Sequence, residues 1–260
     1  MNGEIVDIRF WQLGLALIFV VTAGTISLIH GLGLARDLAV GTVRTFVQLF
    51  LLGYVLVFVF TLDTGIVVVL IYAAMIAFAA WTIHSRVKER QVAFFVPTLV
   101  SMLASYMVVS VVVCAVMVGV EPWWKPQYFL PLGGMVVGNS MNAIAITLDR
   151  MFGELRSRRD EVEMMLSLGA DYREASHDVF TNALKAGMIP SINSMMAVGM
   201  VFIPGMMTGQ ILAGADPLVA VRYQIVVMTM LVGSTALGSL IVAWFIRRRC
   251  FGEDHVLKLR

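Results

Sequence analysis

Uncharged polar side chains lie in the middle of two apolar runs in the second half of the chain. The run that begins at Pro131 contains Asn139 and Asn142, and the run that begins at Pro190 contains Asn193. An amide in hydrocarbon is costly unless it finds a partner, so these side chains should face protein or a water-filled path. Hydrogen bonds between helices and the lining of a translocation path both fit this pattern. The residues that could line such a path are Gln48, Asn139, Asn142, Asn193, Ser194, Met195, Met206, Met207, Thr208 and Gln210.

Methionine is frequent in the same two runs, and the chain contains 18 methionines in 260 residues. Thioether sulfur suits soft metal ions such as Cu(I), but methionine also fills irregular apolar gaps in protein interiors. Both explanations stay open, and the sequence identifies no residue as a metal ligand.

The sequence lacks several motifs that are typical of enzymes and of ion-coupled carriers. No Asp or Glu lies well inside an apolar run, which disfavours a carrier coupled to protons or sodium ions. The sequence has no G-x-x-x-x-G-K-[ST] motif and therefore no phosphate-binding loop of its own. It also lacks the H-E-x-x-H and G-x-S-x-G motifs of hydrolases. We therefore expect no catalytic residues, no enzyme activity and no cofactor bound by this chain.

The composition is typical of an integral membrane protein. Hydrophobic residues make up 59% of the chain and charged residues 14%, against about 25% charged residues in soluble domains. The net charge of +2 gives no indication of nucleic acid as a partner. We expect one all-α domain over residues 1–260 that contacts membrane lipid through about seven transmembrane helices. The expected spans are 11–29, 45–62, 64–83, 92–119, 129–148, 188–212 and 221–246.

The distribution of basic residues predicts the orientation of these spans. With the N-terminus outside, all but three of the 19 Lys and Arg residues fall on the cytoplasmic side, the exceptions being Arg9, Lys125 and Arg222. The C-terminus is then cytoplasmic. Residues 30–44 are too short and too mixed to span, so we expect a surface helix or an extension of the second span.

Residues 149–187 form a polar segment between the fifth and sixth expected spans, on the cytoplasmic side. We expect two helices here, the first of which ends at Gly169, where a residue without Cβ can adopt the left-handed cap. Asp171 is a good N-cap for the second helix, and Glu174 is placed to complete a capping box. We expect the second helix to end near Gly187.

Small residues and a proline predict two features of the last spans. Gly134 and Gly138 are spaced to let another helix approach closely. The Pro204-Gly205 pair should break or kink the sixth span, and such a break is tolerated where the backbone is buried or lines a cavity.

Most of the chain closely resembles the FetB (YbbM)-type permeases, the membrane subunits of a small group of ATP-binding cassette (ABC) transporters. Pro-Gly-Met-Met-Thr-Gly-Gln at 204–210 is the most specific match. The other matching stretches are Gly134-Met135, Gly138-Asn139, Met141, Glu163 through Ala170, Glu174-Ala175, Pro190, Asn193-Ser194-Met195 and Tyr223-Gln224-Ile225.

The resemblance implies a permease in the cell inner (plasma) membrane, linked to iron export and, in plant relatives, to aluminium tolerance. It implies a homodimer that works with a separate ATP-binding subunit, on which ATP and Mg would bind. Glu163, Gly169, Ala170 and Glu174 would couple the permease to that subunit. Two alternatives stay open: an ABC permease for a lipid or nucleotide sugar, and an ATP-independent channel or partner protein that uses the polar segment as a binding platform.

Overall fold

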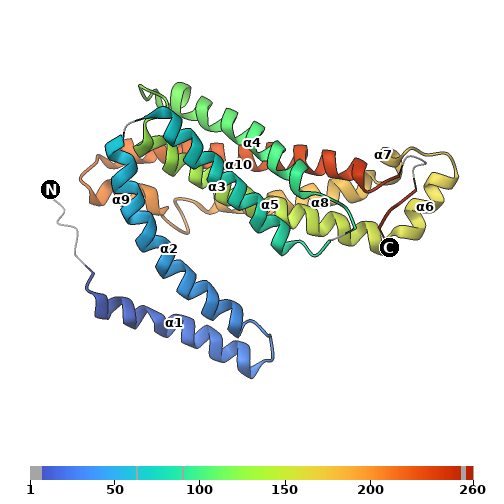
Figure 1. Cartoon of the computed structure of the whole chain (residues 1–260), viewed down its shortest axis with the longest axis horizontal. Coiled ribbons are helices and arrows are strands. Elements are labelled where there is room, and N and C mark those ends of the chain that lie inside the picture. The colour runs from blue at the N-terminus through green and yellow to red at the C-terminus, as the bar shows by residue number, and fades with distance from the viewer. Residues whose placement is uncertain (1–7, 63, 90, 253–255, 260) are drawn as a thin grey trace. The chain divides into compact units, whose positions relative to one another are not determined.

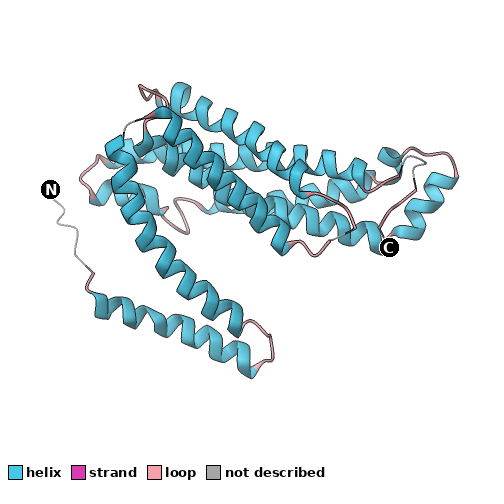
Figure 2. Cartoon of the chain, in the orientation of Figure 1, coloured by secondary structure: helices cyan, strands magenta, loops and turns pink. Residues whose placement is uncertain are grey.

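A computed structural model describes residues 8–62, 64–89, 91–252 and 256–259, and these residues form helices joined by loops (Figures 1 and 2). The chain divides into two compact units, the first of which contains α1, α2 and residues Leu212–Gly214. The helices are α1 (Phe10–Ile29), α2 (Ala35–Leu62), α3 (Gly65–Arg86), α4 (Phe95–Val112), the π-helical η1 (Val113–Val118), α5 (Pro126–Ser157), α6 (Arg159–Ser167), α7 (Tyr172–Ala175), α8 (His177–Ala197), α9 (Gly205–Leu212) and α10 (Pro217–Arg249).

The first unit is a helical hairpin of α1 and α2. A turn with positive φ at Gly31 and Gly33 separates the two helices, because glycine adopts this conformation without a steric penalty. The amide of Leu34 donates to the hydroxyl of Ser27 at 3.0 Å and closes the turn. Since α2 begins at Ala35, residues 35–44 extend the second span, which was one of the two expected arrangements.

Six described helices are long and apolar enough to cross a membrane: α1, α2, α3, α4 with η1, α5 and α10. The sixth expected span, 188–212, is not a continuous helix. Its residues are divided between α8 and α9, and residues 198–204 between them are not helical. The predicted break is therefore confirmed. It begins before Pro204, at Val198, and the next residue, Gly199, has φ of +83°.

The part of the chain between Ser176 and Pro217, which contains this break, runs from one end of α10 to the other. Arg247, near the end of α10, donates from Nε to the hydroxyl of Ser176 at 2.8 Å, immediately before α8 begins. The chain must therefore return along the length of α10 before it enters that helix at Pro217. Two shorter helices with a break make this passage in place of a single long one.

The core of the second unit is built around α5, where glycines allow large side chains to approach. Tyr72 of α3 lies edge-on to Phe129, with ring centroids 5.1 Å apart, and a Cβ added at Gly133 would lie 2.6 Å from the Tyr72 ring. Within this chain the closest approach among these three glycines is therefore at Gly133, beside the predicted Gly134 and Gly138. A Cβ at Gly138 would have no neighbour within 4 Å, and one at Gly134 would meet only the flexible end of Met75.

Candidate functional site

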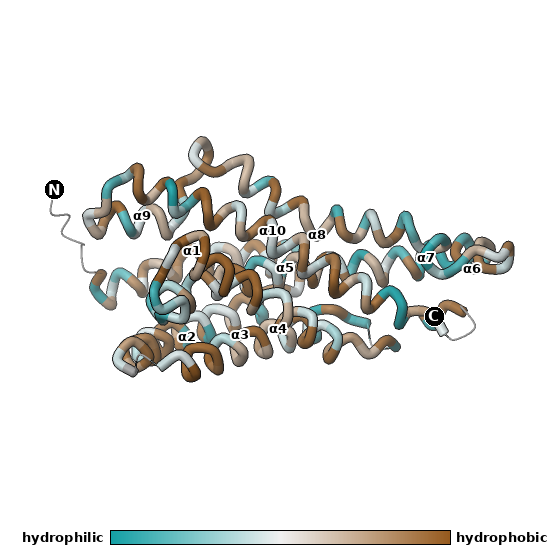
Figure 3. Tube along the Cα trace, turned by 90° about the horizontal axis from the view of Figure 1, so that it is seen from above, coloured by the Kyte–Doolittle hydropathy of each residue, from teal (hydrophilic) through white to brown (hydrophobic). Residues whose placement is uncertain are grey.

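The polar segment, residues 149–187, begins as a continuation of α5, which extends to Ser157 rather than ending near residue 148. It then turns through α6 and α7 into α8. Figure 3 shows hydrophilic residues among hydrophobic ones around α6 and α7, at one end of the second unit. The segment therefore has the composition of a projection into water.

The turn between α6 and α7 has the predicted local geometry. Gly169 has φ of +96°, and the amide of Ala170 donates to the Met165 carbonyl at 3.1 Å. The Glu174 amide donates to Asp171 Oδ1 at 2.7 Å, and the Asp171 amide donates to Glu174 Oε2 at 3.1 Å. Both halves of the capping box are thus present.

The predicted helix end near Gly187 is wrong, because α8 continues to Ala197. Gly187 is a packing position and not a terminator: a Cβ there would lie 2.0 Å from the Thr147 hydroxyl and 2.7 Å from the Ala143 carbonyl of α5. Pro190 lies inside the helix. Close packing of α8 on α5 outweighs the local preference of Gly and Pro for a helix end.

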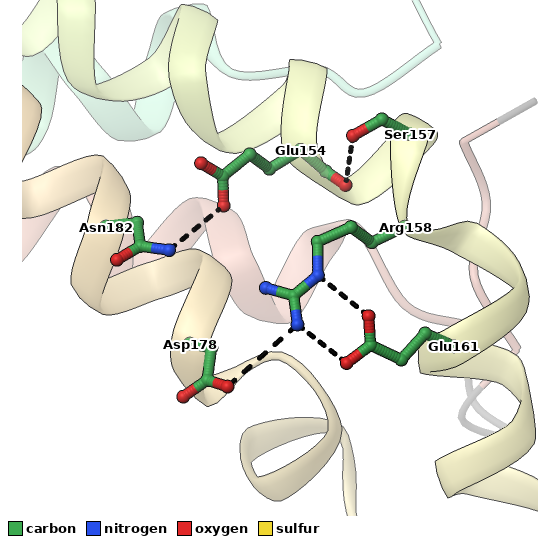
Figure 4. A network of polar contacts seen from close by, with 6 residues as sticks. All are labelled: Glu154, Ser157, Arg158, Glu161, Asp178 and Asn182. Atoms are coloured by element: carbon green, nitrogen blue, oxygen red, sulfur yellow. Dashed lines mark hydrogen bonds and ion pairs between the residues drawn. The ribbon is translucent and has the colours of Figure 1, made fainter.

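Charged side chains tie the corner between α5 and α6 to the start of α8 (Figure 4). The Arg158 guanidinium donates to both carboxylate oxygens of Glu161, at 2.6 and 2.8 Å, and lies 3.9 Å from Asp178. The hydrogen bond from Arg158 lowers the pKa of the Glu161 carboxyl below its usual value. Nearby, Asn182 of α8 donates to Glu154 at 3.5 Å.

Two apolar side chains project from the end of α6, within the most polar part of the chain. Met164 is 57% exposed and Leu168 is 81% exposed. Glu163, on the same helix, pairs with Arg159 at 2.7 Å and keeps 40% of its side chain exposed. Exposed apolar groups beside charged groups on a short helix are a combination that protein-binding surfaces also have.

A buried arginine, Arg247, joins the polar segment to the last helix. Its Nε donates to the Ser176 hydroxyl at 2.8 Å, its Nη2 donates to the Arg173 carbonyl, and its guanidinium lies 4.8 Å from the centre of the Phe180 ring. Only 7% of Arg247 is exposed. The sequence did not single it out, because Arg247-Arg248-Arg249 reads as an ordinary basic cluster at the end of a span.

Asn139 lies in a hydrogen-bonded cluster between three helices. Its Nδ2 donates to the hydroxyls of Ser191 on α8 and Thr235 on α10, both at 2.9 Å. These two hydroxyls lie 3.3 Å from each other. The contacts satisfy the expectation that Asn139 faces protein, and they join α5, α8 and α10; a role of Asn139 in translocation stays a prediction.

The other expected path residues lie in different environments. Asn142 is exposed and accepts a hydrogen bond from Arg86 at 3.1 Å. Asn193 and Ser194 are exposed on α8, and the Ser194 hydroxyl donates to the Pro190 carbonyl at 3.0 Å. Gln48 is an exposed residue of α2, in the first unit.

A cavity of about 460 Å³ lies where the break between α8 and α9 faces α10. Of the expected path residues, Met195 and Met207 line it, whereas Met206, Thr208 and Gln210 of α9 do not. Gln224 matched the family in sequence but was not among the expected path residues. It lines the cavity, is 6% exposed, and has a side-chain oxygen without a hydrogen-bond partner among the described residues. The lining residues are Met195, Val198, Gly199, Ile203, Pro204, Met207, Val221, Gln224, Ile225, Met228 and Thr229.

The described residues contain no cluster of three or more His, Cys, Asp or Glu side chains that could hold a metal ion. The cavity lining has no ionisable side chain, so thioethers and neutral oxygens are its only candidate metal donors. Such donors suit soft ions better than hard ions.

The helices and their polar projection define a multi-pass membrane protein. The chain belongs to the family described as "Uncharacterised protein family (UPF0014)", whose model matches residues 10–251. This membership confirms the resemblance inferred from the sequence.

Similar proteins come from bacteria and plants. "UPF0014 membrane protein YjkA" of Bacillus subtilis is 34% identical over 90% of this chain and 92% of its own length. "Probable iron export permease protein FetB" of Escherichia coli is 31% identical over 95% of this chain and 93% of its own length. "Protein ALUMINUM SENSITIVE 3" of Arabidopsis thaliana is 33% identical over 86% of this chain and 81% of its own length. No solved structure matches the chain.

Proposed function

We propose that this chain is the membrane-spanning permease subunit of an ABC transporter that exports metal, with iron as the cargo. ATP and Mg would bind a separate ATP-binding subunit docked on the polar segment at the cytoplasmic face of the plasma membrane. Two permease subunits would work with two such subunits. The name of the E. coli relative supports the transport class and the cargo.

The observation that carries the docking proposal is the exposed apolar end of α6. Met164 and Leu168 are exposed at the end of a helix whose first turns are charged, and burying them against a partner would release water from apolar surface. Glu163 would face basic groups of the partner. Gly169 and Ala170 would keep the turn tight, and the Asp171–Glu174 capping box would hold its shape.

Movement of the ATP-binding subunits would reach the membrane through contacts already present in this chain. The polar segment is continuous with α5 and α8, and Arg247 of α10 donates to Ser176 within it. These are the same three helices that Asn139 joins through Ser191 and Thr235. A tilt of α6 would therefore act on the helices around the polar cluster.

A non-metal cargo, such as a lipid or a nucleotide sugar, is a second candidate within the same transport class. The specific observation in its favour is the absence of ionisable side chains from the cavity lining. Hard metal ions prefer carboxylate and other oxygen ligands.

The docking proposal is tested by purifying the chain with its ATP-binding subunit and comparing Leu168→Asp with Asp160→Asn. Leu168→Asp places a charge where an apolar contact is expected, and loss of one central contact weakens binding by about 2 kcal/mol, or about 30-fold. Asp160→Asn changes an exposed residue of the same helix and should bind normally. Unchanged assembly and ATPase stimulation in Leu168→Asp and Glu163→Ala would sink the docking role and favour a channel or partner protein.

A further inference from the structure

The cavity beside the helix break is too large to be explained as a site for a bare ion. Its volume is about 460 Å³, which falls in the range of roughly 300–1,000 Å³ typical of sites for small organic molecules. A single dehydrated ion would fill a small fraction of that space. The size therefore leaves room for a molecule with many atoms.

The chemistry of the lining points the same way. Nine of the eleven lining residues carry no amide, hydroxyl or charge, and the exceptions are Gln224 and Thr229. The Thr229 hydroxyl already donates within its own helix, to the carbonyls of Ile225 and Val226 at 3.0 Å. A charged ligand would lose its hydration here without gaining an opposite charge. An uncharged, largely apolar ligand would lose little hydration free energy on entering this cavity.

Gln224 supplies one polar group in this apolar setting. The residue is 94% buried, and its side-chain oxygen has no hydrogen-bond partner among the described residues. A buried polar atom without a partner costs free energy, and such atoms are rare in folded proteins. A ligand that carries a hydrogen-bond donor would satisfy this amide.

We propose that the cavity binds an uncharged, largely apolar organic molecule that carries a hydrogen-bonding group, which contacts the Gln224 amide. As a cargo site the cavity rests on the proposed permease function, whereas binding itself does not require it. An iron cargo would then enter as an uncharged complex with an organic ligand. The same chemistry is found in a free solute and in a membrane lipid such as diacylglycerol.

The test uses a photoreactive octanol that carries a diazirine, with the purified full-length chain in detergent and without an ATP-binding subunit. Peptide mass spectrometry should locate the label in residues 195–207 and 221–229. A photoreactive alkane of the same length should label these residues less by about threefold to tenfold, because it cannot make the hydrogen bond.

Variants separate a specific site from general partitioning into apolar surface. Gln224→Leu should remove the preference for the alcohol over the alkane, and Met228→Trp should reduce both labels by filling the cavity. The matched control is Gln210→Leu, since Gln210 also has a buried oxygen without a partner in the described structure but does not line the cavity. Equal labelling of other membrane-facing helices, or a preference unchanged in Gln224→Leu, would overturn the proposal.

The source of the natural ligand is resolved by repeating the labelling in lipid nanodiscs with added diacylglycerol. Loss of cavity labelling would identify a lipid as the occupant, and unchanged labelling would identify a free solute; both results support a site of this chemistry. The labelling does not depend on Leu168, so failure of the docking test and failure of this one are distinguishable.

Discussion

Burial of the charged Arg247 side chain costs free energy, and specific contacts offset that cost. Its guanidinium donates to the Ser176 hydroxyl and the Arg173 carbonyl and stacks on Phe180. Arginine can do this because its donors form a rigid planar fork, which lysine lacks. The residue therefore connects the polar segment to α10 by geometry as well as by charge.

We expect Arg247→Leu to destabilise the protein by about 1–3 kcal/mol, because it leaves the Arg173 carbonyl and the Ser176 hydroxyl without this donor. Arg247→Lys should be intermediate. Thermal unfolding of the detergent-solubilised chain, followed by size-exclusion chromatography, measures the effect. The control is Arg248→Leu, since Arg248 is exposed. Equal melting temperatures for the Arg247 and Arg248 variants would contradict the structural role.

Residue-level prediction from the sequence succeeds where the interaction is local. The pairing of Asp171 with Glu174 depends on residues three positions apart, so the spacing alone predicts it. The contacts of Arg247 with Ser176 and the place of Gln224 in the cavity depend on helices that meet only after folding. Residue type and spacing therefore do not predict these partners.

Gly187 decides how closely α8 and α5 approach. We expect Gly187→Ala to destabilise the protein by about 1–3 kcal/mol or more, because the new methyl group would overlap Thr147 and the backbone of α5. Gly138→Ala is the matched control, since it has open space and gains up to about 1 kcal/mol of helix propensity. Thermal unfolding of both variants measures the difference, and a destabilisation of the same size in each would refute the assignment.

At the scale of elements, hydropathy located six membrane-length helices, because a run of about 20 apolar residues is a strong signal. The sequence predicted that residues 188–212 would be divided, but it did not predict that residues 198–204 would all be non-helical. Pro204 is visible in the sequence as a helix breaker, whereas the turn at Gly199 is closed by its amide bonding back to the Phe202 carbonyl at 3.0 Å. Likewise, the sequence alone suggests that Gly187 ends a helix, and only its packing against α5 shows that the helix continues.

For the whole molecule, the packing of α8 along α10 from the Ser176–Arg247 contact predicts that Ser167 and the start of α10 at Pro217 lie on opposite sides of the membrane. Ala213 precedes Pro217 by four positions in the sequence. We expect a membrane-impermeant maleimide to label Ala213→Cys in intact cells and Ser167→Cys only after permeabilisation. Both positions are exposed. Labelling of both variants in intact cells would contradict a crossing between them and the cytoplasmic assignment of the polar segment.

The native cysteines give this experiment a low background. Cys114 and Cys250 are free and buried, and burial raises the pKa of the Cys250 thiol to about 12. Because the thiolate is the form that reacts, the unmodified chain should label only after denaturation. The unmodified chain, treated in parallel, is the control for both variants.

The cluster around Asn139 also has a consequence for the order in which the chain is made. Asn139 and Thr235 are 96 positions apart, so the amide enters the bilayer well before its partner on α10 has been synthesised. Until then a polar group in hydrocarbon is only partly satisfied. A ribosome that stalls before the last helix would leave this amide in the membrane with the Ser191 hydroxyl but without the Thr235 hydroxyl.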